Sequence, residues 1–450
     1  MRRLPRHPLL LGFCLLLSAA ACLAPRAAGI APSGTVPSGA AQPGVAPAVR
    51  NPLDRSAVLF IADGLGPAYV TATRMARGGE DGVLNLDSMP YTAIVRTYAF
   101  DDPVTDSAAA ATAMACGRKT VNGVLGQDST AVYGQHDGRP LESITTWARR
   151  RGLRVGIVTT ARVTHATPAA FYASHNDRDL EEAIARQALG ADLDLLLGGG
   201  REMFRRTLEI GEANLEKRVA ERGWRLVTDA AGLEAVAAPE DRVLGLFADD
   251  HMPYEPERVK MEAAAAAPAA RRGSAAVPSL TVMTVWSIGR LSQGGRPFLL
   301  VVEGGRPDHA AHENWALTLI DEVAAFDDAV GAALGRLDPA TTLVLATGDH
   351  ETGGLAISSR KDSGTVLTFA TGPGTKQKAE RAPHSWSDLA PTSLHDPHGE
   401  HTAVDVPLYA WGAGADQVHG TLENTAVFYL LRAHLEGKTP DRDSLVHAAR

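Results

Sequence analysis

The chain has 450 residues and a formal net charge of −8, with 45% hydrophobic and 21% charged residues. These proportions are typical of a globular protein and exclude wholesale disorder, a coiled coil and a multispan membrane protein. So acidic a chain lacks the basic surface that non-specific nucleic-acid binding needs, and its three cysteines cannot form a disulfide framework.

The N-terminal segment predicts export. Residues 1–6 are basic, residues 9–21 form an apolar run that is short for a membrane span, and this run closes on small residues. This is the pattern of a signal peptide, which we place at residues 1–24. Cys22 directly follows three alanines and offers a lipid anchor as the alternative to plain secretion. The expected location is therefore periplasmic or secreted, with or without a lipid anchor.

The rest of the chain is expected to form one large domain. Residues 25–54 are rich in Pro, Gly and Ala, carry no periodic apolar face and predict a flexible tether. The domain is placed at residues 55–440, with loop insertions near 200–290 and 355–400. Residues 441–450 are expected to be a C-terminal tail.

Short apolar runs that end in small or acidic residues predict buried strands, and helical patterns separate them. Because the runs are apolar on both faces, they favour a parallel sheet that helices cover on each side. The alternation predicts an α/β fold of three layers, α/β/α, with a central and mostly parallel sheet. The predicted strands are residues 57–61, 155–158, 193–197, 298–302, 342–346 and 405–410, and the clearest predicted helices are residues 141–151, 179–189 and 314–337.

Acidic residues follow several of these strands. Asp63, Glu303 and the pair Asp349-His350 stand at strand ends, where ligands bind in open α/β sheets. Carboxylates gathered at one edge would repel each other unless they surround cations. The alternative role for any one of these residues is to cap the next helix. This alternative is less convincing because several predicted strands are followed by an acidic residue.

The segment 306–312 adds histidines to this pattern. Asp308 and His312 are four residues apart on a predicted helix, so both can reach one ion. Asp349-His350 is a second such pair, and His401 precedes the last predicted strand. Mixed Asp and His ligands favour Zn²⁺. On its own, His401 would be interpreted as a surface histidine.

A candidate nucleophile opens an alanine-rich helix. Residues 104–108 read Val-Thr-Asp-Ser-Ala, and the helix is expected to end at Gly117. Asp106 or Ser107 would serve as a plain helix cap in one interpretation. In the other, Ser107 is an activated nucleophile at a helix N-terminus, which favours negative charge. The local sequence leaves both open.

Six sequence blocks together resemble the alkaline phosphatase family. They follow the family order and span Asp63 to about Tyr409, nearly all of the chain beyond the tether. The resemblance implies an alkaline-phosphatase-like fold and a phosphate-monoester hydrolase. The blocks are residues 60–66 (FIADGLG), 104–113 (VTDSAAAATA), 163–170 (VTHATPAA), 302–312 (VEGGRPDHAAH), 347–354 (TGDHETGG) and 400–402 (EHT).

The resemblance implies two Zn²⁺ ions and one Mg²⁺ ion. It assigns Asp308, His312 and His401 to one zinc ion, and Asp63, Asp349 and His350 to the other, which also touches Ser107. It assigns Asp63, Thr167 and Glu303 to magnesium. Ser107 would attack phosphorus to form a phosphoserine, which a hydroxide on the first zinc ion would hydrolyse.

The same resemblance points to residues that hold the substrate. Arg178 lies eleven residues after Thr167, the spacing of the family's phosphate-binding arginine, although a solvated arginine is the alternative. His165 and His309 stand where the best-known enterobacterial branch has Asp and Lys. We expect them beside the substrate, where they would affect metal choice and pH optimum.

Two further function classes stay open at this point. One is a phosphodiesterase or sulfatase of the same superfamily, although Ser107 lacks a sulfatase context. The other is a non-catalytic exported lipoprotein that binds metal or phosphate. The expected partners are small phosphate monoesters, not nucleic acid, and the resemblance leaves a homodimer open. Residues 355–400, with His384, Trp386, His395 and His398, are expected to form loops over the site.

Overall fold

The computed structural model describes most of the chain beyond its N-terminal segment. Among the described residues, no helix combines the length and the apolar character that crossing a bilayer requires. The predicted signal peptide, Cys22 and most of the predicted tether lie outside the described residues, as do residues 382–398 of the predicted loop. The described residues are 54–209, 211–237, 241–266, 276–360, 364–370, 380–381 and 399–448.

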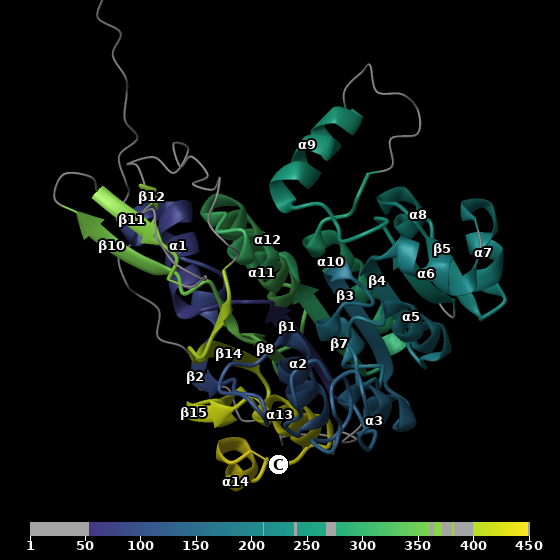
Figure 1. Ribbon diagram of the computed structural model, residues 1–450, viewed down its shortest axis with the longest axis horizontal. Helices are drawn as coiled ribbons and strands as arrows, with labels where there is room; N and C mark the ends of the chain where they lie inside the picture. The colour runs from purple at the N-terminus through teal and green to yellow at the C-terminus, as the bar shows by residue number, and fades with distance from the viewer. Residues whose placement is uncertain are drawn as a thin grey trace, which may run out of the picture. The chain divides into compact units, whose positions relative to one another are not determined.

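A 10-stranded sheet with the order β15-β2-β14-β8-β1-β7-β3-β4-β6-β5 forms the centre (Figure 1). The run from β8 to β5 is parallel, whereas β14 is antiparallel to both β8 and β2. The predicted mostly parallel sheet is therefore confirmed. The strands are β1 (Ser56–Ala62), β2 (Tyr91–Arg96), β3 (Arg154–Arg162), β4 (Leu195–Gly199), β5 (Trp224–Val227), β6 (Arg242–Leu246), β7 (Phe298–Gly304), β8 (Thr342–Gly348), β14 (Val406–Gly412) and β15 (Gly420–Glu423).

Helices cover both faces of this sheet, which confirms the three-layer α/β fold. Alternate side chains of β1 enter different cores, because successive residues of a strand point to opposite faces. Leu59 packs in the core that includes α2, α3 and α13, whereas Phe60 packs in the core that includes α1, α10 and α12. The helices are α1 (Pro67–Gly78), α2 (Ser107–Cys116), α3 (Ile144–Arg150), α4 (Ala166–Ala169), α5 (Glu181–Gly190), α6 (Arg201–Leu208), α7 (Glu212–Ala220), α8 (Ala230–Glu234), α9 (Glu255–Ala266), α10 (Leu280–Leu291), α11 (Arg306–His312), α12 (Ala316–Leu334), α13 (Ala426–Leu435) and α14 (Arg442–Val446).

Smaller elements complete the described part of the chain. Strand β9 (Glu351–Thr352) pairs with β13 (His401–Thr402) in an antiparallel ribbon beside the carboxyl end of β8. Strands β10 (Ala356–Arg360), β11 (Gly364–Thr368) and β12 (Glu380–Arg381) form a separate small sheet. The expected insertion near 200–290 contains α6 to α10 together with β5 and β6, which extend the main sheet to its far edge.

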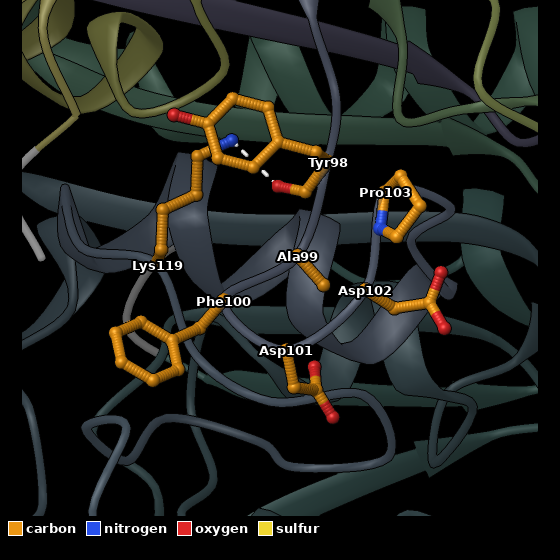
Figure 2. Close-up of a pocket in the computed structure, with 7 residues that line it drawn as sticks. All are labelled: Tyr98, Ala99, Phe100, Asp101, Asp102, Pro103 and Lys119. Carbon is orange, nitrogen blue, oxygen red and sulfur yellow. Dashed lines mark hydrogen bonds between the residues drawn. The ribbon is translucent and has the colours of Figure 1, made fainter.

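A buried lysine supports the connection from β2 to α2. Lys119 Nζ lies 3.8 Å from the centre of the Tyr98 ring and donates a hydrogen bond of 2.7 Å to the Tyr98 carbonyl (Figure 2). Its ammonium is 3.3 Å from Glu423 Oε2, and burial lowers the pKa of Lys119 to about 8. Glu423 also pairs with Arg96 at 2.6 Å. A hollow of about 440 Å³ lies beside Lys119, whose ammonium already has Glu423 and the Tyr98 carbonyl as partners.

Replacing Lys119 with methionine is expected to lower the free energy of unfolding by about 3 kcal/mol. The substitution leaves the buried Glu423 carboxylate with only Arg96 as its cation, and breaking a buried pair costs more than the pair contributes. Urea unfolding followed by circular dichroism measures the change. The double variant Lys119→Met/Glu423→Gln should lose less free energy of unfolding than the two single variants lose together. A loss equal to the sum of the two single losses would contradict this explanation.

Candidate metal centre

The carboxyl ends of β1, β7 and β8 place the acidic residues of the site. Ile61 of β1 is in register with Glu303 of β7 and with Thr347 of β8. Asp63 and Asp349, which follow β1 and β8, therefore reach the same edge of the sheet as Glu303. All three acidic side chains are fully buried. The strands thus bring together carboxylates that the sequence placed far apart.

A glycine lets the loop after β1 approach the neighbouring helix. Gly64 has a φ of 78°, in the left-handed region that favours glycine. A Cβ at this position would lie 2.9 Å from the Cα atom of Asp308 and 3.0 Å from Thr352 Oγ1. Because any larger residue would clash there, Gly64 fixes how closely Asp63 can approach helix α11.

The first cluster combines helix α11 with strand β13. Asp308 and His312 are one turn apart on α11, with 3.3 Å between Asp308 Oδ2 and His312 Nε2. His401 reaches the same place from β13, where its Nε2 lies 3.6 Å from Asp308 Oδ1 and 3.2 Å from His312 Nε2. These three ligand atoms are close enough to hold one ion.

The second cluster joins the ends of β1 and β8. His350 Nε2 lies 3.4 Å from Asp63 Oδ1 and 3.3 Å from Asp349 Oδ2. The other oxygen of Asp349 accepts hydrogen bonds of 3.0 Å from the backbone N–H groups of Gly64 and His350. Those bonds orient Asp349 so that its Oδ2 faces the cluster.

A third cluster shares Asp63 with the second. Ligand atoms of Asp63, Glu303 and His165 lie close enough to hold one ion. Thr167 Oγ1 approaches Asp63 Oδ2 at 3.4 Å, and the Thr159 hydroxyl donates to Glu303. The predicted magnesium ligands Asp63, Thr167 and Glu303 are thus brought together. His165, which we had expected only beside the substrate, contributes a ligand atom to the same group.

Several buried oxygens at these clusters lack hydrogen-bond donors. Among the described residues, Asp63 Oδ1, Asp349 Oδ2 and Glu303 Oε1 have no hydrogen-bond partner. Burial, followed by the neighbouring carboxylates, raises the pKa of Asp63 well above its ordinary value. Burial also raises the pKa of Glu303 to about 8. Since unpaired buried carboxylates are costly, their chemistry fits cations.

The histidines of the first cluster present the nitrogen that a metal would need. His312 Nδ1 donates to the Gly399 carbonyl at 2.5 Å, and His401 Nδ1 donates to the Thr105 carbonyl at 2.9 Å. A proton on Nδ1 leaves Nε2 with a free lone pair, and in both residues Nε2 is the atom that faces the cluster. Hydrogen bonding of the remote ring nitrogen to a carbonyl is typical of metal-binding histidines.

The candidate nucleophile lies at the start of α2. Asp106 is the N-cap and accepts a hydrogen bond of 2.9 Å from the Ala109 N–H, so the capping role belongs to this residue. Ser107 is the first helical residue, its side chain is buried, and its Oγ lies 3.2 Å from His350 Nε2. The helix ends at Gly117 in the left-handed conformation, as expected.

Arg178 is bonded to Asp106, the residue that precedes Ser107. Its Nη1 donates a hydrogen bond of 2.9 Å to Asp106 Oδ2, and this oxygen also accepts one from the Gly123 N–H. Arg178 is part of a concave pocket of about 720 Å³ that also contains Ser107 and the first cluster. The pocket is lined by Asp102, Val104, Thr105, Asp106, Ser107, Asn122, His165, Arg178, Asp308, His309, His312, Glu400 and His401.

Three histidine rings pack together beside this pocket. His165 and His309 line the pocket, and their ring centres are 5.5 Å apart. His251, from the loop after β6, lies 4.3 Å from the His309 ring and accepts a hydrogen bond on Nδ1 from the Arg162 N–H. Sequence reasoning did not identify His251, because nothing in its local sequence connects it with the other motifs.

Sequence reasoning also missed the threonines that support the ligands. Thr352 donates to Asp308, and Thr159 donates to Glu303. A signal for Thr352 was available, since it lies within the block at residues 347–354. His384, Trp386, His395 and His398, expected in loops over the site, lie outside the described residues.

Comparisons with known proteins agree with this geometry. A family model described as alkaline phosphatase matches residues 54–436. Streptomycin-6-phosphate phosphatase of Streptomyces griseus is 34% identical over 432 residues, which cover 85% of this chain and 90% of that protein. Alkaline phosphatase 4 of Bacillus subtilis is 31% identical over 428 residues, which cover 82% of this chain and 86% of that protein.

Solved structures show the same similarity. The alkaline phosphatase of the Antarctic bacterium TAB5 has a TM-score of 0.65 and 27% identity, covering 85% of this chain and 97% of that one. The Thermus thermophilus alkaline phosphatase has a TM-score of 0.67 and 27% identity, covering 86% and 92% respectively. A variant of the TAB5 enzyme in which a histidine is replaced by aspartate is described with Mg bound in its M3 site.

Proposed function

The chain belongs to the alkaline phosphatase family, whose members are metal-dependent phosphatases, and from this we propose that it hydrolyses phosphate monoesters through a phosphoserine at Ser107. The observation that carries the proposal is the position of the Ser107 hydroxyl. It lies at a helix N-terminus, 3.2 Å from His350 Nε2, in a pocket that also holds Arg178. The alcohol and inorganic phosphate are the products.

The three clusters fit two Zn²⁺ ions and one Mg²⁺ ion. The nitrogen-rich cluster of Asp308, His312 and His401 favours zinc. The third cluster offers magnesium the oxygens of Asp63 and Glu303, with Thr167 Oγ1 beside Asp63, while His165 adds one nitrogen to this set. When bound, such ions lower the pKa of a coordinated hydroxyl and neutralise charge on the attacking and leaving oxygens of an in-line displacement.

In the first step, Ser107 Oγ attacks phosphorus. The Oγ–P bond forms as the bond from phosphorus to the ester oxygen breaks, and the leaving alcohol takes up a proton from water. The Ser107 proton passes to solvent water, which balances the proton that the leaving alcohol takes up. The dipole of α2 favours the negative charge that develops on Oγ at its N-terminus. Arg178 can hold two phosphate oxygens with its planar fork.

In the second step, water attacks the phosphoserine. The water oxygen forms the new bond to phosphorus as the Ser107 Oγ–P bond breaks, which releases phosphate and restores the serine hydroxyl. Asp106 holds Arg178 in place through this cycle by its 2.9 Å ion pair, so the phosphate site is preorganised. His165 and His309 line the same pocket and are placed to contact the phosphate or its water.

The substrate class is tested by comparing two ester types. Purified protein loaded with zinc and magnesium should hydrolyse p-nitrophenyl phosphate much faster than bis-p-nitrophenyl phosphate. Chelation should abolish the monoester activity, and added zinc with magnesium should restore it. A diester rate above the monoester rate would indicate a phosphodiesterase. Monoester hydrolysis that survives chelation would contradict a metal-dependent mechanism.

Arg178→Ala is expected to lower kcat/KM for monoesters by about 10–100-fold, mostly through a higher KM. The reason is the loss of charge-assisted hydrogen bonds to phosphate, each worth about 1.5–3 kcal/mol. Steady-state kinetics with p-nitrophenyl phosphate and product inhibition by phosphate measure the change. Arg186→Ala, at an exposed position of α5, is the control and should behave as the wild type. Unchanged phosphate inhibition in Arg178→Ala would remove this arginine from the proposal.

We further propose that the chain is exported. The basic start and the short apolar run of residues 1–21 support a cleaved signal, and Cys22 provides the alternative of a lipid anchor. Mass spectrometry of the mature N-terminus distinguishes a free residue from an acylated Cys22. An N-terminus that begins at Met1 in the secreted or envelope fraction would contradict both.

A further inference from the structure

One buried hydroxyl connects the first two clusters. Thr352, on β9, is fully buried, and its Oγ1 donates a hydrogen bond of 2.5 Å to Asp308 Oδ1. The same Oγ1 lies 3.2 Å from Nδ1 of His350. Asp308 belongs to the first cluster and His350 to the second. A single side chain thus contacts a ligand of each cluster.

The chemistry of the groups fixes the direction of both contacts. An ionised carboxylate can only accept, so the one proton of the Thr352 hydroxyl goes to Asp308. The Thr352 oxygen then accepts from His350, which requires the His350 proton to be on Nδ1. His350 Nε2 is consequently left with its lone pair, and Nε2 is the atom that faces Asp63, Asp349 and Ser107.

The backbone around Thr352 reinforces this arrangement. Thr352 is in register with His401, the third ligand of the first cluster, in the β9–β13 ribbon. A Cβ on Gly64 would lie 3.0 Å from Thr352 Oγ1, so the loop that carries Asp63 also runs against this hydroxyl. Glu351 anchors the ribbon by accepting hydrogen bonds from the Gly354 N–H and the Leu355 N–H. The hydroxyl therefore has little freedom to move.

We propose that Thr352 is a positioning residue that sets the ligand geometry of both zinc clusters at once. Its hydroxyl holds Asp308 in one orientation and keeps the proton of neutral His350 on Nδ1. Loss of this hydroxyl therefore weakens metal binding at two sites. This inference rests on the proposed function for the identity of the metals. It goes further by assigning one hydroxyl as a shared support of the two clusters, in addition to the stacked rings of His350 and His401.

The test replaces Thr352 with valine, which keeps the shape and removes the hydroxyl. Zinc affinity is measured by competition with a chromogenic chelator on the full-length protein, which requires no catalytic activity. We expect both zinc dissociation constants to rise by about 10–100-fold, the usual effect of losing an outer hydrogen-bond partner of a metal ligand. At saturating zinc the weakened sites are filled, so kcat should return close to the wild-type value although the zinc dissociation constants stay raised. KM should change little.

Two matched variants control this experiment. Thr284→Val removes a buried hydroxyl without a hydrogen-bond partner, on α10, and should leave both zinc affinities unchanged. Thr352→Ser keeps the hydroxyl and loses only a methyl group, so its affinities should stay within about threefold of the wild type, well short of the usual loss. Thr352→Ser also decides the question if Thr352→Val does not fold. A folded Thr352→Ser protein whose zinc dissociation constants rise by about 10–100-fold would overturn the proposal, because its hydroxyl is still present.

The remaining outcomes are equally decisive. Wild-type zinc affinity in a folded Thr352→Val protein would overturn the positioning role, and weakening of only one of the two sites would overturn the shared support. These zinc-binding results do not require phosphatase activity. An inactive wild-type protein on every phosphate monoester would count against the phosphatase proposal, while the zinc titrations would still decide the role of Thr352.

Discussion

Ser107→Ala is expected to lower kcat for phosphate-monoester hydrolysis by about 10⁴-fold or more, the range seen when a covalent nucleophile is removed. The structure supplies the reason, because Ser107 Oγ is buried beside His350 Nε2 at the start of α2. Among the described residues that line this pocket, Thr105 has the one other hydroxyl, and that hydroxyl donates its proton to the Asp106 carbonyl. KM should change much less than kcat, since the residues that hold phosphate remain.

This experiment has a close control in the same chain. Ser174→Ala removes a buried serine hydroxyl that has no hydrogen-bond partner and lies outside the pocket lining, so its kinetics should match the wild type. Metal content by mass spectrometry should be equal in both variants and the wild type. A Ser107→Ala protein that keeps its metals and retains more than about a tenth of the wild-type kcat would contradict the nucleophile assignment.

Removal of the metals is expected to abolish activity and to destabilise the protein strongly. An ion present at about 1,000 times its dissociation constant stabilises the folded state by about 4 kcal/mol per site, and the site here comprises three clusters. Without the ions, four carboxylates, those of Asp63, Glu303, Asp308 and Asp349, remain buried close together. Differential scanning calorimetry with and without chelator should show a large fall in Tm that zinc and magnesium reverse.

The metal-free protein should also respond to pH in a defined direction. Burial raises the pKa of Glu303 to about 8 and that of Asp349 to about 7. A carboxyl whose folded pKa is raised binds its proton more tightly when folded, so its stabilisation is present at low pH and is lost as pH rises through the folded pKa. Buried histidines such as His309, whose pKa burial lowers to about 4, act in the opposite direction only below about pH 6.5. The Tm of the metal-free protein should therefore fall between about pH 7 and pH 8. A Tm that rises over this interval would contradict the buried carboxylate cluster.

The main elements of the fold could be predicted because the central strands are apolar on both faces. The run at residues 57–61 became β1, and its position between β7 and β8 follows the rule that buried parallel strands occupy the middle of a sheet. Boundaries were less accurate. The helix expected at residues 314–337 begins at Ala316, because Asn314 adopts a φ of 56° and separates it from α11.

The edges of the sheet were harder to predict. Strands β5 and β6 fall in the segment 200–290, which was expected to hold loop insertions, and β5 is only 4 residues long with Arg225 exposed. Strand β2 has a half-exposed pattern and pairs with β14, which is more than 300 residues away in sequence. Pairings over such distances depend on the tertiary fold, and local periodicity carries no information about them.

The individual candidate ligands of the site could be predicted from the strand ends and the family motifs. The structure brings together all of the predicted ligands, from Asp63 to His401. What sequence could not supply is the support around them. The hydroxyl of Thr352 contacts Asp308 because of where β9 lies, and His251 contacts His309 because the loop after β6 returns to it. Both depend on contacts between segments that are distant in sequence.

Detection of the covalent phosphoserine intermediate tests the proposed mechanism most directly. Protein loaded with zinc and magnesium would be mixed with a phosphate monoester carrying labelled phosphorus, quenched in acid and digested, and its peptides analysed by mass spectrometry. We expect label on the peptide that contains Ser107, with fragmentation that places the phosphate on this residue, and no label in Ser107→Ala. Label on another residue, or full turnover without any labelled peptide under rapid quenching, would contradict it.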